Sequence, residues 1–406
     1  MSEVEASIGG VVGFKVAGVH AGLKADGALD FALIVSDRPC TAAAVFTTNT
    51  IKAAPVLYDM EVLANNNTHI RAVAVNTKCA NACTGDQGIA NAKQTAKLAA
   101  EALGIGEDEV IVMSTGVIGT QLPMDKIAQG VHAASDSLGE NNWDAASQAI
   151  MTTDTRPKRA FATVTTAAGK QYHIAGISKG AGMIAPNMAT MLGFIVTDAA
   201  LDPLQSADTL FASANRTFNR IVVDGDMSTN DSVFLLANGA SSVTIDDADR
   251  DQFAAALSDV CRKLAQDIVR DGEGATKFIT LHVNGAPDDA AARTIANTIG
   301  TSPLVKTAFY GGDANWGRIV AAAGRSGIDL DAQKLKLWFA ADEASEKLLL
   351  FASGMPTQYD EAQATALVKA PEVVVTLDCG IGSGSATIWT CDLSHDYVSI
   401  NGHYRT

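Results

Sequence analysis

Regularly spaced apolar positions mark the helices of this chain. The clearest pattern runs through residues 249–270, where apolar side chains recur every three or four residues and therefore share one helix face. These side chains are Phe253, Leu257, Val260, Leu264 and Ile268. The Ala-rich segment 86–103, which Gly104 closes, and segment 124–138 also predict helices, and Asp202-Pro203 is typical of the first turn of another.

Short apolar runs between the helical segments predict strands. They cover residues 109–113, 159–166, 171–177, 191–197, 277–283, 335–340, 372–377 and 385–389. The second and third runs predict a hairpin around residues 167–170, and Gly380-Ile-Gly-Ser-Gly predicts a hairpin turn between the last two. Since helices and strands interleave without a regular βαβ order, the pattern favours an α/β fold of layered mixed sheets flanked by helices.

Composition and charge narrow the class of protein. A chain of 406 residues is long enough for two or three domains, and 47% apolar with 18% charged residues is typical of a compact protein. The net charge of −15 argues against nucleic acids and anionic membranes as partners. No run approaches the roughly 18 apolar residues of a membrane span, and the start, Met1-Ser-Glu-Val-Glu, lacks the features of a targeting signal. We therefore expect a cytoplasmic protein.

The cysteines and histidines predict no metal site. Six cysteines in a chain of this length are typical of buried thiols rather than a disulfide framework. Cys79 and Cys83 form a C-x-x-x-C pair without a second pair nearby, and the seven histidines show no metal-binding spacing. No phosphate-binding motif of the G-x-x-x-x-G-K-[ST] type occurs either. The sequence thus predicts neither a metal nor a bound cofactor.

The segment from Lys179 to Gly193 places a hydroxyl in an unusual setting. Its glycines and Pro186 preclude a regular helix, and Thr190 stands where this loop enters the apolar run 191–197. Local pattern leaves two interpretations open. Thr190 is either a buried hydroxyl bonded to the backbone, or an N-terminal nucleophile made by self-cleavage between Ala189 and Thr190, whose freed amine acts as the base.

A set of motifs along nearly the whole chain resembles one family, the ornithine acetyltransferases, which are bifunctional glutamate N-acetyltransferases of arginine biosynthesis. The processing-site signature of that family is similar to residues 179–193. The other matching segments are Val45-Phe-Thr-Thr-Asn49, Asn81-Ala-Cys-Thr-Gly85, Met113-Ser-Thr-Gly-Val-Ile-Gly119, Thr152-Thr-Asp154, Asp224-Gly-Asp-Met-Ser-Thr-Asn-Asp231, Gly272-Glu-Gly-Ala-Thr-Lys277, Gly312-Asp-Ala-Asn-Trp-Gly-Arg318 and Tyr404-Arg-Thr406. Each is weak alone, and their shared order is specific.

The resemblance implies a fold and a reaction. The precursor is expected to cleave itself between Ala189 and Thr190 into an α chain, residues 1–189, and a β chain, residues 190–406. The layered sheets would be similar to those of N-terminal-nucleophile or aminopeptidase-like proteins, and the chains would assemble as α2β2 or larger. Thr190 would carry acetyl from N-acetylornithine to glutamate. Acetyl-CoA stays open as a second donor.

The resemblance also implies the site residues. The oxyanion of the acyl transfer would be held by the Thr115 hydroxyl and the Gly116 N–H. The substrate would be bound by Thr153, Lys179, Thr190, Glu273, Asn401 and Thr406. For an acidic protein that binds a dicarboxylic amino acid, a lysine such as Lys179 in a Gly-rich loop suits a carboxylate, and Glu273 suits an ammonium group.

Two departures from the family pattern leave alternatives open. The chain has Thr77-Lys78-Cys79 where the family often has Ser-Gly-Asn, and Gly402-His403 replaces the residues that commonly precede the terminal Tyr. The rival hypotheses are an autoprocessing aminopeptidase or amidase, which would pass the acyl group to water, and an unprocessed amino-acid-binding protein.

Overall fold

The computed structural model describes residues 4–5, 7–185 and 191–403, and the chain divides into two compact units. The first unit comprises residues 1–219 and 226–268, and the second comprises residues 220–225 and 269–406. Two units agree with the number of domains that the length predicts. The expected cleavage position, 189/190, lies within the first unit, so the expected α and β chains do not coincide with the two units.

One mixed sheet of nine described strands forms the frame of the first unit. The strands are β1 (Val4–Glu5), β2 (Phe14–Val19), β3 (Phe31–Phe46), β4 (Ile70–Asn76), β5 (Val110–Ser114), β6 (Lys158–Thr165), β7 (Gln171–Lys179), β8 (Leu192–Thr197) and β10 (Ser232–Ala237). Their order is β1-β6-β7-β8-β10-β3-β4-β5, and β2 also pairs with β3. The predicted strands of this unit and the β6–β7 hairpin are confirmed. Every residue of β8 is buried, and the strand pairs with antiparallel β7 on one side and parallel β10 on the other.

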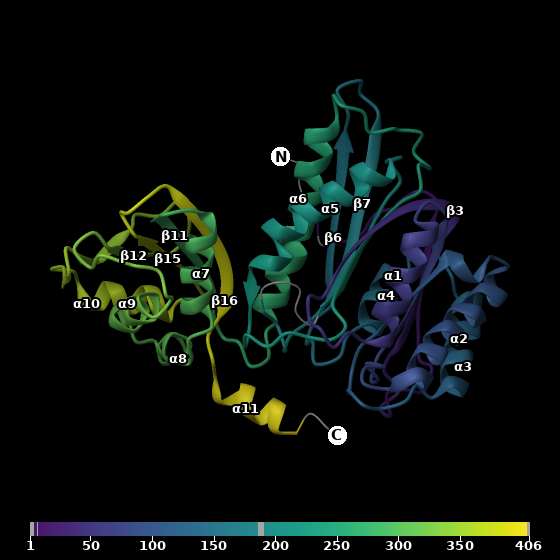
Figure 1. The fold of residues 1–406 in the computed structure, drawn as a ribbon, viewed down its shortest axis with the longest axis horizontal. Helices are drawn as coiled ribbons and strands as arrows, with labels where there is room; N and C mark the ends of the chain where they lie inside the picture. The colour runs from purple at the N-terminus through teal and green to yellow at the C-terminus, as the bar shows by residue number, and fades with distance from the viewer. Residues whose placement is uncertain (1–3, 6, 186–190, 404–406) are drawn as a thin grey trace. The chain divides into compact units, whose positions relative to one another are not determined.

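Six described helices belong to this unit. They are α1 (Ala54–Asn66), α2 (Gly85–Leu103), α3 (Met124–Asp136), α4 (Trp143–Ala149), α5 (Pro203–Arg216) and α6 (Arg250–Arg270), with short 3-10 turns at Glu107–Glu109 and Phe218–Arg220. The sequence predicted four of them, α2, α3, α5 and α6, but not α1 and α4. Helix α2 contacts both α1 and α3 (Figure 1). Asp202 caps α5 by accepting from Gln205 N, and the five apolar side chains predicted on one face of α6 are all buried.

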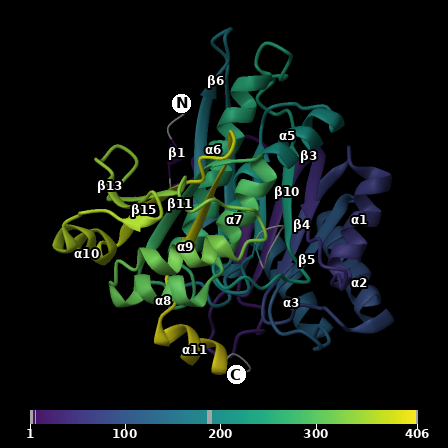
Figure 2. The same ribbon diagram turned by 60° about the vertical axis from the view of Figure 1, so that its left-hand side comes forward.

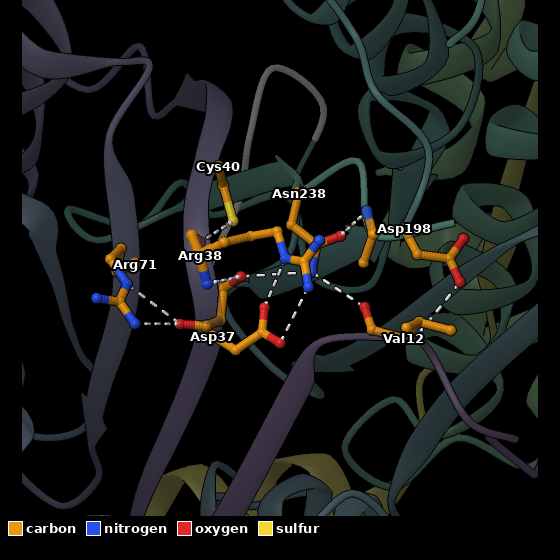
Figure 3. Close-up of polar contacts among 9 residues, drawn as sticks. Val12, Asp37, Arg38, Cys40, Arg71, Asp198 and Asn238 are labelled. Carbon is orange, nitrogen blue, oxygen red and sulfur yellow. Dashed lines mark hydrogen bonds and ion pairs between the residues drawn. The ribbon is translucent and has the colours of Figure 1, made fainter. Parts of the chain in front are cut away.

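Strand β3 is sixteen residues long, which the sequence pattern did not predict. Its pairing with β4 shifts between Val35 and Cys40, and this irregularity bends the strand. Polar side chains bind the strand at this irregularity. Arg71 donates to the Ser36 carbonyl from Nη2 at 3.2 Å and from Nε at 3.3 Å, and Asn238 Nδ2 lies 3.3 Å from Ser36 Oγ (Figure 3). The bend is therefore stabilised by side chains from β4 and from the end of β10.

The second unit has its own mixed sheet of seven described strands. They are β9 (Ile221–Val222), β11 (Phe278–Ala286), β12 (Lys336–Ala340), β13 (Leu348–Ala352), β14 (Met355–Pro356), β15 (Glu372–Asp378) and β16 (Gly384–Cys391), in the order β14-β13-β12-β15-β11-β16-β9. The helices are α7 (Asp289–Gly300), α8 (Pro303–Gly311), α9 (Trp316–Gly324), α10 (Glu361–Lys369) and α11 (His395–Gly402). Helices α7, α8 and α9 contact one another, and α7 packs on β11 and β16 (Figures 1 and 2).

The predicted hairpin turn at Gly380–Gly384 is wrong. Strand β11 lies between β15 and β16, pairing in parallel with one and antiparallel with the other. The connecting loop crosses the end of β11, where Cys379 N and Ile381 N donate to the carbonyls of Asn284 and Gly285 at 2.8 and 2.9 Å. Residues 379–383 do form a loop, but no local pattern reveals that a strand from elsewhere in the chain lies between β15 and β16.

Among the described helices, none combines the length and the apolar character that crossing a bilayer requires.

Candidate functional site

The two expected oxyanion residues directly follow β5. Thr115 is buried, and its N–H donates to the Asn76 carbonyl at 3.1 Å. Gly116 has a φ of +136°, and a Cβ on it would lie 2.2 Å from the carbonyl carbon of Lys78. Both observations require glycine at this position, because any side chain would collide with the backbone of the neighbouring loop.

That neighbouring loop, residues 77–83, is itself conformationally unusual. Lys78, Asn81 and Cys83 all have positive φ without being glycine. The loop is held by a backbone ladder in which Val117 N donates to Lys78 O at 3.1 Å and Ala80 N donates to Val117 O at 3.0 Å. The sequence departure at residues 77–79 thus lies in a strained loop that contacts the predicted oxyanion turn.

Asn230, in the segment before β10, forms hydrogen bonds with the 77–83 loop and with the end of β5. Its buried Nδ2 donates to the Ala80 carbonyl at 2.7 Å and to the Ser114 carbonyl at 2.8 Å. One amide side chain therefore fixes the residue that precedes Thr115 and the loop that faces it.

Asp231, the next residue, anchors the start of β8. Its Oδ1 accepts from Met191 N at 2.8 Å, and Ser232 N donates to Met191 O at 3.3 Å. The Asp231 side chain is fully buried, and this burial raises the pKa of its carboxyl well above the usual range, although the Met191 N–H and the charge of Lys179 oppose the rise.

Asp154 is the centre of a second buried cluster. Its Oδ1 accepts from Lys158 Nζ at 2.6 Å and from Gly180 N at 2.7 Å. Burial alone would raise the pKa of Asp154, but the charges of Lys158 and Lys179 and the Gly180 N–H hold it well below the usual range. This carboxylate joins the segment that contains Thr153 to the end of β7, where Lys179 is 2% exposed.

These contacts form one continuous series within the first unit. It runs from Asp154 and Gly180 to Lys179, which is paired with Leu192 in the sheet, and from Met191 through residues 230–231 to Ser114. Thr115, Gly116, Thr153 and Lys179 all belong to this series or directly adjoin it. Ala189 and Thr190 lie outside the described residues.

The second unit holds another pair of predicted site residues. Asn401 Nδ2 donates to Glu273 Oε2 at 2.7 Å, and Glu273 is 8% exposed. Glu273 follows the C-terminal end of α6, as predicted, and Ser394 Oγ fixes the same loop by donating to the Gly274 carbonyl at 2.6 Å. The structure thus brings Glu273 and Asn401 together, while Thr406 lies outside the described residues.

The sequence pattern predicted no role for Asp154, Lys158, Asn230 or Asp231. Three of the four stand in segments that carried the resemblance, 152–154 and 224–231. Charged or amide side chains at the edge of buried apolar strands were the signal that could have identified them, because such groups are kept only where they have partners.

Across the described residues, no three His, Cys, Asp or Glu side chains gather in an arrangement that would hold a metal ion. Five cysteines are buried free thiols and Cys83 is an exposed one. The absence of metal and cofactor stays a prediction.

Comparison with known proteins gives a match over nearly the full length. A model of the ArgJ family matches residues 15–406. The chain is 50% identical over 400 residues to the arginine biosynthesis bifunctional protein ArgJ of Geobacter sulfurreducens, covering 98% of this chain and 100% of the relative. It is 47% identical over 397 residues to the protein of that name from Thermotoga neapolitana, covering 97% and 99%. The crystal structure of ornithine acetyltransferase complexed with ornithine from Mycobacterium tuberculosis is 41% identical, covers 46% of this chain and 98% of that one, and has a TM-score of 0.42.

Proposed function

Since the chain belongs to the ArgJ family, we propose that it transfers the acetyl group of N-acetylornithine to glutamate and releases ornithine and N-acetylglutamate. Membership confirms the resemblance that the motifs predicted, and it makes the protein an enzyme of arginine biosynthesis. The observation that carries the proposal is the match of whole chains: 50% identity spans the relative from end to end.

The first step of the proposal is self-cleavage. The Thr190 hydroxyl attacks the Ala189 carbonyl carbon, the peptide C–N bond breaks, and the Thr190 nitrogen takes up a proton to become an amine. Water then hydrolyses the ester and releases residues 1–189 from residues 190–406. The backbone on both sides supports this step: Gly180 and Met183 have positive φ, and Met191 is fixed at both its N–H and its carbonyl.

Acetyl transfer reuses the same hydroxyl. Thr190 Oγ attacks the acetyl carbonyl of N-acetylornithine while the α-amine of Thr190 takes the hydroxyl proton. The C–N bond breaks, the leaving ornithine amine receives that proton, and an acetyl ester remains on Thr190. The glutamate amine then attacks the ester, and the proton it loses returns to Thr190 Oγ as N-acetylglutamate forms.

Thr115 and Gly116 are the proposed oxyanion donors of each tetrahedral intermediate. Support comes from the rigid loop that holds them, since preorganised donors need no rearrangement when charge develops. Gly116 cannot bear a side chain there, and Asn230 fixes the carbonyl of Ser114, the residue before Thr115. Such a donor is worth about 2.7–4 kcal/mol where one has been removed from an enzyme.

The remaining predicted residues are proposed to bind the amino-acid substrates. Lys179 is the proposed partner of a substrate carboxylate, and Glu273 that of a substrate ammonium group. Asn401 orients the Glu273 carboxylate, which the 2.7 Å contact between the two side chains supports. Thr153, Thr190 and Thr406 supply hydroxyl groups. An α2β2 or larger assembly, acetyl-CoA as a second donor and a cytoplasmic location stay predictions.

A donor assay tests this function. Purified protein is incubated with glutamate and either N-acetylornithine or acetyl-CoA, and N-acetylglutamate is measured. A second sample receives N-acetylornithine without glutamate, and intact-mass analysis should find one acetyl group on the chain that begins at Thr190. Formation of acetate and ornithine at the same rate with and without glutamate would instead support the amidase alternative. An uncut chain that binds ornithine without turnover would support the binding-protein alternative.

A further inference from the structure

If the chain is cut before Thr190, the contacts around Met191 have to hold the new N-terminus in place. Cleavage removes the covalent connection on one side of the nucleophile, and only the contacts downstream can then hold it in place. The nearest described residue downstream is Met191, whose nitrogen is bonded to the Thr190 carbonyl carbon. Because a peptide unit is planar, a hydrogen bond to the Met191 N–H restrains the orientation of the whole peptide group to which that N–H belongs.

Asp231 is the side chain that fixes this N–H. The Met191 N to Asp231 Oδ1 distance is 2.8 Å, and Ser232 N holds the carbonyl of the same residue at 3.3 Å. Asp231 is itself held from another strand, because its backbone carbonyl accepts from Thr47 N at 2.9 Å. The contact therefore runs from β3 through Asp231 to the residue that adjoins the proposed nucleophile.

A comparison within the same unit shows what is special about this position. Asp59, on α1, is equally buried, accepts one backbone N–H from Val112 at 2.9 Å, and likewise has a pKa raised by burial. Among the described residues, neither Asp59 Oδ2 nor Asp231 Oδ2 has a hydrogen-bond partner. A buried carboxyl of this kind is therefore not in itself a sign of function, and the distinction of Asp231 is the N–H that it binds.

We infer that Asp231 is a positioning residue for Thr190, acting through the Met191 amide in both self-cleavage and acetyl transfer; this inference rests on the proposed function. The Asp231 side chain takes no part in bond making. It supplies a hydrogen-bond acceptor at a fixed point, so that the Thr190 hydroxyl and α-amine keep their orientation after residues 1–189 are released.

The test compares Asp231→Ala with Asp231→Asn. Asparagine keeps an oxygen acceptor for the Met191 N–H, whereas alanine removes it. We expect Asp231→Ala to slow precursor cleavage and to lower kcat of the cleaved enzyme at least tenfold, with KM for N-acetylornithine within about twofold of wild type. Asp231→Asn should restore most of kcat.

Asp59→Ala is the matched control for loss of a buried carboxyl. It should lower the thermal midpoint by an amount similar to Asp231→Ala and leave kcat of the folded, cleaved protein near the wild-type value. The inference is overturned if Asp231→Ala keeps wild-type kcat, if Asp231→Asn is as slow as Asp231→Ala, or if Asp59→Ala lowers kcat equally. Wild-type protein without acetyl transfer would overturn the proposed function instead, so the two failures are distinguishable.

If Asp231→Ala yields no folded protein, the rate at which the Asp231→Asn precursor cleaves itself tests the role of Asp231. Its time course is followed on denaturing gels beside wild type and Asp59→Asn. Cleavage at the wild-type rate supports a role as acceptor, and cleavage slowed tenfold or more, with Asp59→Asn unaffected, overturns it.

Discussion

Asp154 accepts a hydrogen bond from the backbone N–H of Gly180 at 2.7 Å, across 26 positions of the chain. The same oxygen accepts from Lys158 Nζ at 2.6 Å, and both side chains of that ion pair are buried. One carboxylate therefore fixes the backbone just after Lys179, where the segment that leads to the expected cleavage position begins.

Asp154→Asn should cost about 3–5 kcal/mol of unfolding free energy at pH 7, because it leaves the Lys158 charge buried without its counter-charge. The folded pKa of Asp154 is lowered, so its contribution is present above the unfolded value of about 3.9 and is lost as pH falls through the folded pKa. Urea unfolding of both proteins between pH 7 and pH 3 measures this, and the difference should shrink towards acid.

Asp37→Asn is the control for that experiment. Asp37 forms an exposed ion pair with Arg38, and such pairs contribute little to stability because water screens their charges. An Asp37 effect as large as the Asp154 effect would show that burial is not the cause.

Asp59 should show the opposite dependence on pH. Burial raises its folded pKa well above the unfolded value, so its contribution is fully present below about 3.9 and is lost as pH rises towards the folded pKa. Relative to Asp59→Asn, the wild type should therefore become less stable between pH 4 and pH 7. A difference that is constant over this range would mean that the carboxyl does not change its charge on unfolding.

Gly116→Ala should abolish most turnover, because the added Cβ would lie 2.2 Å from the Lys78 carbonyl carbon and the loop would have to move. Gly119 lies in the same loop with a φ of +82° but has no atom within 4 Å of its ideal Cβ. Gly119→Ala should thus cost only the roughly 1–2 kcal/mol of a left-handed backbone and retain kcat. Equal loss of kcat in both variants would argue against Gly116 as an oxyanion donor.

The sequence predicted the elements that local patterning controls. Helix α6, the β6–β7 hairpin and the Asp202 cap follow from spacing and capping chemistry within one segment. The course of the loop at 379–383 does not follow from local patterning. Strand β11, from about 100 residues earlier in the chain, lies between β15 and β16, the two strands that this loop connects.

The same limit applies to the candidate site. The resemblance supplied Lys179, Thr115 and Glu273, whereas Asp154 and Asp231 emerged only from the structure. Their partners, Gly180 and Met191, lie 26 and 40 positions away, and no helical or strand period links them. Nonlocal hydrogen bonds to the backbone are invisible in a pattern of side chains.

Lys179→Ala should leave cleavage possible and weaken turnover by about 1.5–3 kcal/mol, because a substrate carboxylate loses its charged partner. The measurement is kcat/KM for N-acetylornithine and for glutamate. Lys179→Met, which keeps most of the side-chain volume, separates the lost charge from a cavity. Wild-type kinetics in either variant, with both substrates, would exclude Lys179 from the site.

Thr190 carries the most demanding prediction, because one hydroxyl has two tasks at different times. Thr190→Ala removes both, so the variant should remain a single chain of 406 residues and form no acetyl-enzyme. Thr190→Ser keeps a hydroxyl and should still cleave, more slowly, since it lacks the methyl group that restricts the rotamer. Intact-mass analysis after incubation with N-acetylornithine reads out both tasks in each variant. An acetyl group found on Lys179 or a cysteine of the wild type, or normal turnover by Thr190→Ala, would overturn the mechanism while leaving the reaction itself intact.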